Sequence, residues 1–182
     1  ADKLIKTIEW WKHYTSINNS NMDNNPAPGN KKGGLTTILE KSLGAVAKGG
    51  NSILKDVLSY AEPLKNKGFN FMDSPGYDPV SVTGQVASGA NVICFTTGRG
   101  SCFGCKPVPS LKLATNTTMF NKLSEDMDVN CGTVIDGEET VEQVGKRVFE
   151  LVLKTASGSR SKSELNGYGD EEFNPWQVGV VM

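Results

Sequence analysis

The sequence predicts an α/β fold: a small, mostly parallel sheet with flanking helices, a long N-terminal loop and a C-terminal arm. Helical patterns and short apolar runs alternate along the chain, which is typical of a parallel sheet covered by helices. The run NVICFTT at 91–97 is apolar almost throughout, as in strands that are buried on both faces. The length of 182 residues suits one domain, with room for an appendage.

The N-terminal part of the chain is predicted to hold three helices and one loop. Apolar side chains at helical spacing over 3–17 predict an amphipathic helix. The Asn-, Gly- and Pro-rich segment 18–34 is either an ordered binding loop or a linker. Two more helices are expected, over 36–48 and 51–61. The residues expected to face inward from the first of these are Leu35, Ile38, Leu39 and Val46.

The rest of the chain is predicted to alternate strands with helices. Strands are expected at 69–72, 91–97, 110–116 and 131–135, and helices at 79–88, 117–126 and 139–156. The last helix is the clearest, because its apolar residues keep a 3.6-residue period; they are Val141, Val144, Val148, Leu151 and Val152.

The polar stretch after residue 157 is either a wrapping arm or partly disordered. The chain is therefore expected to have three segments: a helix and loop over 1–34, an α/β domain over 35–158 and the arm over 159–182.

Composition excludes several classes of protein. The 19 Lys and Arg residues balance 20 Asp and Glu residues, which argues against a nucleic-acid-binding protein, because such proteins use a basic excess to neutralise phosphates. Apolar runs stay well short of the roughly 20 residues of a membrane span, and a signal peptide is not visible. Cys94 lies in an apolar run and is expected to be a buried thiol, which favours a reducing, cytoplasmic setting.

Polar, glycine-rich sequence follows three of the predicted strands. Parallel sheets bind ligands at the carboxyl ends of their strands. If the three strands are parallel neighbours, their ends converge on one rim. These ends are Asp73–Gly76, Thr96–Ser101 and Thr115–Thr117.

The loop TTGRGSCFGCKP at 96–107 offers the most chemistry. Gly98 and Gly100 let the backbone approach a ligand, and free amides there can hold an anion. Arg99 adds a fork-shaped donor that matches a carboxylate or phosphate, and Lys106 adds a point charge. A glycine-rich turn with a solvated arginine remains the alternative. The loop lacks the spacing of a nucleotide-binding motif.

The CxxC pair and the single histidine carry less weight. Cys102 and Cys105 lack the second pair that a structural zinc site uses, and they lie in a loop rather than at the start of a helix. His13, the one histidine, lies in the first amphipathic helix, where a surface or interface position is expected. The acidic cluster that begins at Asp128 is expected to be a solvated turn.

Three blocks of sequence together resemble one family. They are NNPAPGNKKGGLTTILEKSLGAVAKGG at 24–50, FMDSPGYDPVSVTGQVASGANVICFTTGRGSCFGCKP at 71–107 and TASGSRSKSELNGYGDEEFNPWQVGVVM at 155–182. In this order they are similar to the carboxyl-terminal portion of the altronate dehydratase/galactarate dehydratase family. The family's catalytic region begins upstream of residue 1, so the resemblance implies that the chain is a carboxyl-terminal fragment of a longer enzyme.

The resemblance implies a hydro-lyase that removes water from sugar acids to give 2-keto-3-deoxy acids. Altronate is the expected substrate and 2-keto-3-deoxygluconate the expected product. Galactarate is the alternative substrate, and a sulfolactate-cleaving lyase is a more distant relative. In isolation the chain is alternatively a non-catalytic sugar-acid-binding or assembly module. A small anionic sugar acid is the expected partner, with a homo-oligomer left open.

The resemblance also implies a divalent metal ion, expected to be Fe(II). With one histidine, the metal shell draws on oxygen ligands of this chain or on residues outside it. Lys41 is a candidate base or electrostatic stabiliser, and Asp73 a candidate metal ligand or acceptor from a substrate hydroxyl. The residues expected to bind the substrate are Asn30, Thr97, Gly98, Arg99, Gly100, Lys106 and Asn116.

Overall fold

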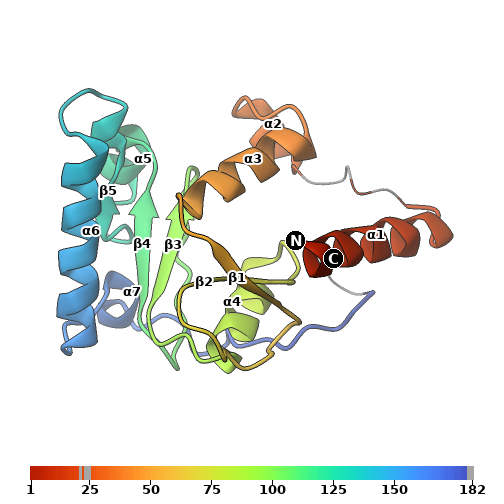
Figure 1. The fold of residues 1–182 in the computed structure, drawn as a ribbon. Coiled ribbons are helices and arrows are strands. Elements are labelled where there is room, and N and C mark those ends of the chain that lie inside the picture. The colour runs from red at the N-terminus through yellow and green to blue at the C-terminus, as the bar shows by residue number, and fades with distance from the viewer. Residues whose placement is uncertain (21, 23–25, 180–182) are drawn as a thin grey trace. The chain divides into compact units, whose positions relative to one another are not determined.

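The computed structural model describes residues 1–20, 22 and 26–179 and confirms an α/β fold, with small parallel sheets flanked by helices (Figure 1). The chain forms two compact units. The first comprises Ala1–Ser59 and Leu64–Asp73, and the second comprises Tyr60–Pro63 and Ser74–Met182. The division into segments 1–34, 35–158 and 159–182 that the sequence predicts is not tested by these units and remains a prediction.

The first unit contains three helices and a two-stranded sheet. Its elements are α1 (Asp2–Ile17), α2 (Pro28–Lys32), α3 (Ile38–Lys48), β1 (Leu54–Leu58) and β2 (Phe69–Met72). Helix α1 confirms the helix predicted over 3–17. Helix α2 lies inside the segment predicted as a loop, and it begins at a proline, whose fixed φ suits the first helical turn.

Helix α3 begins where the sequence predicted, but its packing differs. The Thr37 side chain caps it by accepting a hydrogen bond from the Glu40 amide. The expectation that Leu39 and Val46 face inward is wrong, because they are 67% and 71% exposed. The helix approaches the sheet at its end, where Gly49 lies close to the Phe69 ring, rather than along its length.

Strand β1 corrects the helix predicted over 51–61. It pairs in parallel with β2, from Leu54 opposite Phe69 to Leu58 opposite Met72. The apolar residues in this stretch fit both the 3.6-residue period of a helix and the two-residue period of a strand. Pairing with β2 favours the strand, because it buries Val57 and Leu58.

The second unit is built on a three-stranded parallel sheet in the order β3-β4-β5. Its elements are α4 (Asp78–Ala87), β3 (Ile93–Thr97), β4 (Ser110–Ala114), α5 (Thr117–Lys122), β5 (Val129–Asn130), the short helix η2 (Gly132–Val134), α6 (Val141–Ala156) and α7 (Lys162–Leu165). The central strand β4 is buried at every position. Because the strands are parallel, their carboxyl ends share one edge.

Helices cover both faces of this sheet. Helix α6 runs alongside it (Figure 1) and packs Val148 against a cluster that contains Leu111 and Leu113. On the opposite face, Val82 of α4 packs with Phe103, which lies in the loop after β3.

A capping box of Thr140 and Gln143 starts α6, and Gly158, with φ at 104°, follows its end. Val141, the first residue of the helix, is 67% exposed.

Three further expectations need correction. The strand predicted at 131–135 is wrong: β5 occupies Val129–Asn130, and η2 follows it. The ends of β3 and β4 share a rim as predicted, but β2 pairs with β1 in the other unit. Cys94 is exposed rather than buried, because β3 is an edge strand of its sheet.

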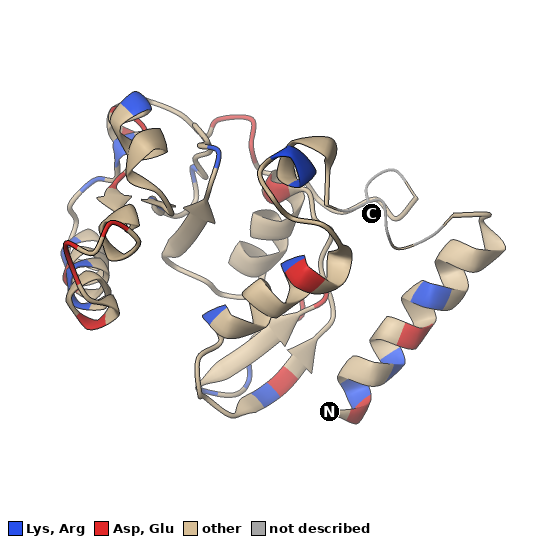
Figure 2. Cartoon of the chain, turned by 90° about the horizontal axis from the view of Figure 1, so that it is seen from above, with Lys and Arg blue, Asp and Glu red and all other residues tan. Residues whose placement is uncertain are grey.

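Acidic and basic residues are both spread along α1 (Figure 2). None of the helices in the described part of the chain combines the length and apolar character that crossing a membrane requires.

Candidate functional site

The turn after β3 is held in a fixed shape by its own residues. The Thr97 hydroxyl oxygen accepts a hydrogen bond from the Gly100 amide at 3.1 Å. Gly100 has φ at 94°, and a Cβ atom there would lie 2.0 Å from the Leu123 Cδ1 atom. Its φ therefore favours glycine, and a larger residue would also have to displace the Leu123 side chain.

Asn116 connects this turn to the end of the neighbouring strand. Its Nδ2 atom donates to the Gly98 carbonyl at 2.9 Å, and its Oδ1 atom accepts from the Met119 amide at 2.8 Å. The second bond caps α5. The same side chain thus joins the carboxyl ends of β3 and β4, so Thr97, Gly98, Gly100 and Asn116 come together as the sequence predicted from the parallel strands.

The two cations of the loop have different surroundings. The Arg99 side chain is exposed and, among the residues that the structure describes, makes no ion pair or hydrogen bond. Lys106 forms an ion pair with Asp170 at 2.7 Å, with both side chains largely exposed. Arg99 is therefore the cation of this loop that is available to an anionic ligand.

The second half of the loop folds back onto the sheet instead of staying at its rim. The Phe103 ring stacks on Phe95 of β3 with centroids 5.5 Å apart. The Phe103 carbonyl accepts a hydrogen bond at 3.1 Å from the Lys112 ammonium group of β4. Phe95 and Lys112 are register partners on the same face of the sheet, so both hold Phe103.

Lys112 is fully buried, which the sequence did not reveal. Its side chain is 0% exposed in the centre of β4. Burial lowers its pKa, while the nearby carboxylates of Asp128 and Asp126 act in the opposite direction. In SLKLA the lysine alternates with leucines, and this pattern alone suggests a solvated face. The alternation correctly places Lys112 on the face opposite the leucines, but the loop covers that face.

The C-terminal arm crosses the same loop. At Gly104, an added Cβ would lie 3.1 Å from the Tyr168 carbonyl oxygen. At Gly169, it would lie 3.0 Å from the Cys105 amide nitrogen. Two glycines thus let the two backbone segments cross closely. Of the two readings of the arm, the structure supports the wrapping one.

Asp128 fastens the arm to the sheet. One carboxylate oxygen accepts from the Lys112 amide at 2.7 Å, and the other accepts from the Lys162 amide at 2.9 Å. The expectation of a solvated turn is therefore wrong for this residue, which joins β4 to the start of α7. A sequence pattern does not reveal this role, because the two partners are distant in the chain.

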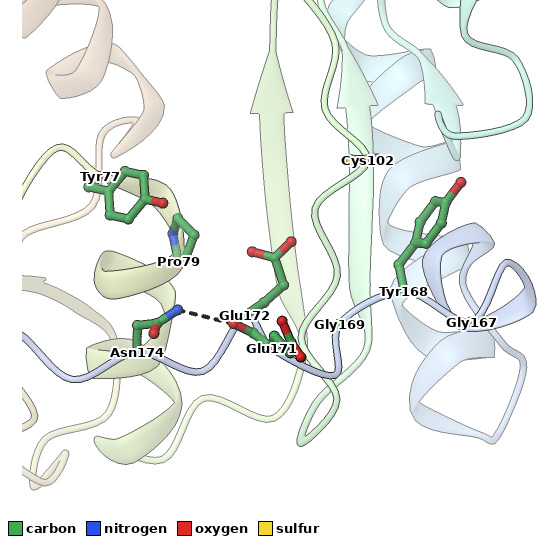
Figure 3. A pocket seen from close by; sticks show the side chains of 9 residues that line it. All are labelled: Tyr77, Pro79, Cys102, Gly167, Tyr168, Gly169, Glu171, Glu172 and Asn174. Carbon is green, nitrogen blue, oxygen red and sulfur yellow. Dashed lines mark hydrogen bonds between the residues drawn. The ribbon is translucent and has the colours of Figure 1, made fainter.

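A pocket of about 410 Å³ lies where the loop, the start of α4 and the arm meet (Figure 3). The residues that line it are Tyr77, Pro79, Cys102, Gly167, Tyr168, Gly169, Glu171, Glu172 and Asn174. The Asn174 side-chain Nδ2 atom donates to the Glu171 backbone carbonyl at 3.2 Å beside the pocket. Cys102 contributes to the lining, whereas Arg99 and Lys106 are absent from the described lining residues.

The remaining candidates belong to the first unit. Asn30 lies in α2, Lys41 in α3, and Asp73 directly follows β2. Both carboxylate oxygens of Asp73 accept from the Trp11 indole nitrogen at 3.1 Å. Burial raises the pKa of Asp73, and the Trp11 hydrogen bond opposes this. That these three residues join the loop residues in one site stays a prediction.

The described residues do not fit a metal ion by themselves. No three His, Cys, Asp or Glu side chains among them gather closely enough to hold one. His13 is exposed on α1, and Cys102 and Cys105 are free thiols. The expected Fe(II) therefore stays a prediction.

The second unit is thus an α/β domain with a parallel sheet, a glycine-rich turn at the carboxyl end of β3 and an exposed arginine on that turn. The family model for D-galactarate/altronate dehydratase, C-terminal, matches residues 1–181. The chain belongs to this family, which confirms the resemblance seen in the sequence.

Characterised relatives bear the names of two dehydratases. Galactarate dehydratase (L-threo-forming) of Escherichia coli (strain K12) is 42% identical over 158 residues, covering 87% of this chain and 30% of the relative. Altronate dehydratase of the same organism is 34% identical over 100% of this chain and 36% of the relative. Altronate dehydratase of Bacillus subtilis (strain 168) is 36% identical over 99% of this chain and 36% of the relative. The chain thus spans about a third of the length of these relatives.

Proposed function

We propose that this chain forms one wall of the active site of a sugar-acid dehydratase that converts altronate into 2-keto-3-deoxygluconate and water. The observation that carries the proposal is Arg99, whose available guanidinium projects from a turn fixed by Thr97, Gly100 and Asn116. A bidentate donor on a rigid turn matches the carboxylate of a sugar acid.

The chemistry explains why a fixed cation is useful. A base removes the proton from the carbon next to the carboxylate, and the bond to the neighbouring hydroxyl breaks as that oxygen is protonated and leaves as water. The resulting enol becomes the 2-keto acid. Negative charge accumulates on the carboxylate as the proton leaves, so a preorganised guanidinium stabilises the transition state more than the substrate. Lys41 and Asp73 remain the candidates for proton transfer.

Two observations bear on the choice of substrate. Altronate carries one carboxylate and galactarate carries two. Within the loop, Arg99 is available for one carboxylate, whereas Lys106 is paired with Asp170, which favours the singly charged acid. The 42% identity to a galactarate dehydratase favours the second candidate, galactarate.

Replacement of Arg99 by alanine in the polypeptide of full family length tests the proposal. We expect kcat/KM for altronate to fall about a hundredfold, as when one charge-stabilising donor is removed from an active site. Arg160→Ala is the matched control, because Arg160 is an exposed arginine between α6 and α7.

A substrate panel and calorimetry complete the test. Unchanged turnover of both altronate and galactarate by Arg99→Ala would refute the role of Arg99. If the unmodified polypeptide turns over galactarate but not altronate, its substrate is galactarate rather than altronate. Heat of sugar-acid binding without turnover by the unmodified polypeptide would favour a non-catalytic binding module.

A further inference from the structure

Helix α6 carries an apolar face that the sheet does not cover. Val141, Phe149 and Leu153 are 67%, 62% and 51% exposed. Gly145 lies between them, with open space where a Cβ would be. These residues recur at every fourth position, so they form one stripe along the helix. The helix packs on the sheet through a different row, which includes Val148.

A row of charges runs directly beside this stripe. Glu142, Lys146, Glu150 and Lys154 each follow a stripe residue by one position, and their signs alternate along the helix. Lys146 and Glu150 lie 3.9 Å apart with side chains 78% and 53% exposed. An alternating row of this kind has the opposite order of signs when the helix is turned end for end. Helix α6 is therefore complementary in charge to an antiparallel copy of itself.

The stripe is also complementary to itself in shape. In a two-fold interface, if residue i contacts residue j of the partner, then j contacts i. With the axis midway between Gly145 and Phe149, the Phe149 ring lies over the partner's Gly145, and Val141 lies against the partner's Leu153. Glycine weakens a helix interior relative to alanine. Here it leaves the space that an aromatic ring from a second helix fills.

We propose that α6 is the surface through which two copies of this chain associate, with the two helices antiparallel about a two-fold axis. Glu142 then lies near the partner's Lys154, and Lys146 lies near the partner's Glu150, within one residue of the register that the apolar stripe sets. The helix has 16 residues and is therefore about 24 Å long. One such seam is smaller than the roughly 1,200 Å² of a standard interface, so the association is weak, with micromolar dissociation constants.

Sedimentation of the chain from micromolar to submillimolar concentration measures this association. Lys146→Glu and Glu150→Lys should each weaken the dimer about tenfold, because two symmetric attractions become repulsions. An equimolar mixture of the two variants should recover the original affinity, since every cross-helix pair then joins opposite charges. In each variant, positions 146 and 150 of the same helix carry like charges, and mixing the variants does not change this. Recovery of the dimer affinity on mixing therefore reports contact between chains.

Phe149→Glu removes the central apolar contact and should leave the chain monomeric. Leu165→Glu is its control, because Leu165 is 66% exposed on α7, outside the stripe. Circular dichroism should be unchanged for both. A chain that stays monomeric at all concentrations overturns the proposal and indicates that other sequence covers the face. Failure of the mixed variants to associate, or an equal effect of Leu165→Glu, overturns it as well.

Discussion

The two units bury their apolar residues to very different extents. In the second unit, β4 is buried at all five positions, and helices cover both faces of its sheet. In the first unit, α3 has no buried residue, and Val57 and Leu58 are the buried apolar residues of its sheet. The second unit therefore has a core that can hold its loops in place, whereas the helices of the first unit have little core of their own to pack on.

The largest difference in stability between the two units is expected when one methyl group is added to a glycine in each. A Cβ at Gly132 would lie 2.2 Å from the Thr117 amide nitrogen and 2.5 Å from the Asn116 carbonyl carbon. Because backbone must move, Gly132→Ala should destabilise the second unit by about 3 kcal/mol. Gly44 in α3 has open space around it, and Gly44→Ala should stabilise that helix by roughly 0.5–1 kcal/mol.

Urea unfolding followed by hydrogen exchange measures both effects, because exchange assigns each change to its unit. Equal and small effects of the two substitutions would show that the second unit is packed no more tightly than the first.

The helix caps give a smaller contrast. Asn116→Ala removes the cap of α5 and the hydrogen bond to Gly98. It should cost about 2 kcal/mol, because a cap and an additional bond are lost together. Thr37→Ala removes only the exposed cap of α3 and should cost about 0.5 kcal/mol. Thermal unfolding of the two variants provides the measurement, and a larger loss at Thr37 would contradict the comparison.

The smallest effect is expected from acid titration, which should act on the two units in opposite directions. Burial raises the pKa of Asp73, so folding favours its protonated form, and the stability of the first unit should rise as the pH falls from the folded pKa toward the unfolded one. Hydrogen bonds from Arg147 and Thr133 lower the pKa of Glu139 in the second unit. The stability that the Glu139 carboxylate adds to the second unit is therefore present above its unfolded pKa and is lost as the pH falls through its folded pKa.

Asp73→Asn and Glu139→Gln should each flatten the pH dependence of their own unit. Unfolding measured at several pH values, with hydrogen exchange to separate the units, provides the test. If acidification destabilised both units alike, and Asp73→Asn did not change this, the raised pKa of Asp73 would be contradicted.

Local pattern was sufficient for the fold class and for most helices. The periodic apolar residues of α6 and its capping residue Thr140 are close in sequence, so they specify that helix without tertiary information. The stretch around Val57 was ambiguous, because its apolar residues suit a helix or a strand, and only the distant partner β2 decides between them. The same limit applies to the strand predicted at 131–135: β5 occupies Val129–Asn130 instead, and Gly132 of η2 packs closely on the start of α5.

Part of the candidate site followed from the sequence for a related reason. Parallel neighbours must end at one edge, so Thr97 and Asn116 could be placed together from the strand pattern alone. The positions of Lys112 and Asp128 could not be found in this way. Their roles depend on a loop and an arm that are far away in the chain, and only long-range packing brings these segments onto the sheet.

The crossing of the arm over the loop at Gly104 and Gly169 has a consequence for biosynthesis. A ribosome makes Gly104 first and Gly169 only 65 residues later, a delay of several seconds at about 5–20 residues per second. During that interval Phe103 can already stack on the sheet, but the segment from Gly104 to Lys106 has no arm above it. The turn at 97–100 and the segment beside it therefore reach their final positions at different moments, because the arm that covers Gly104 is synthesised last.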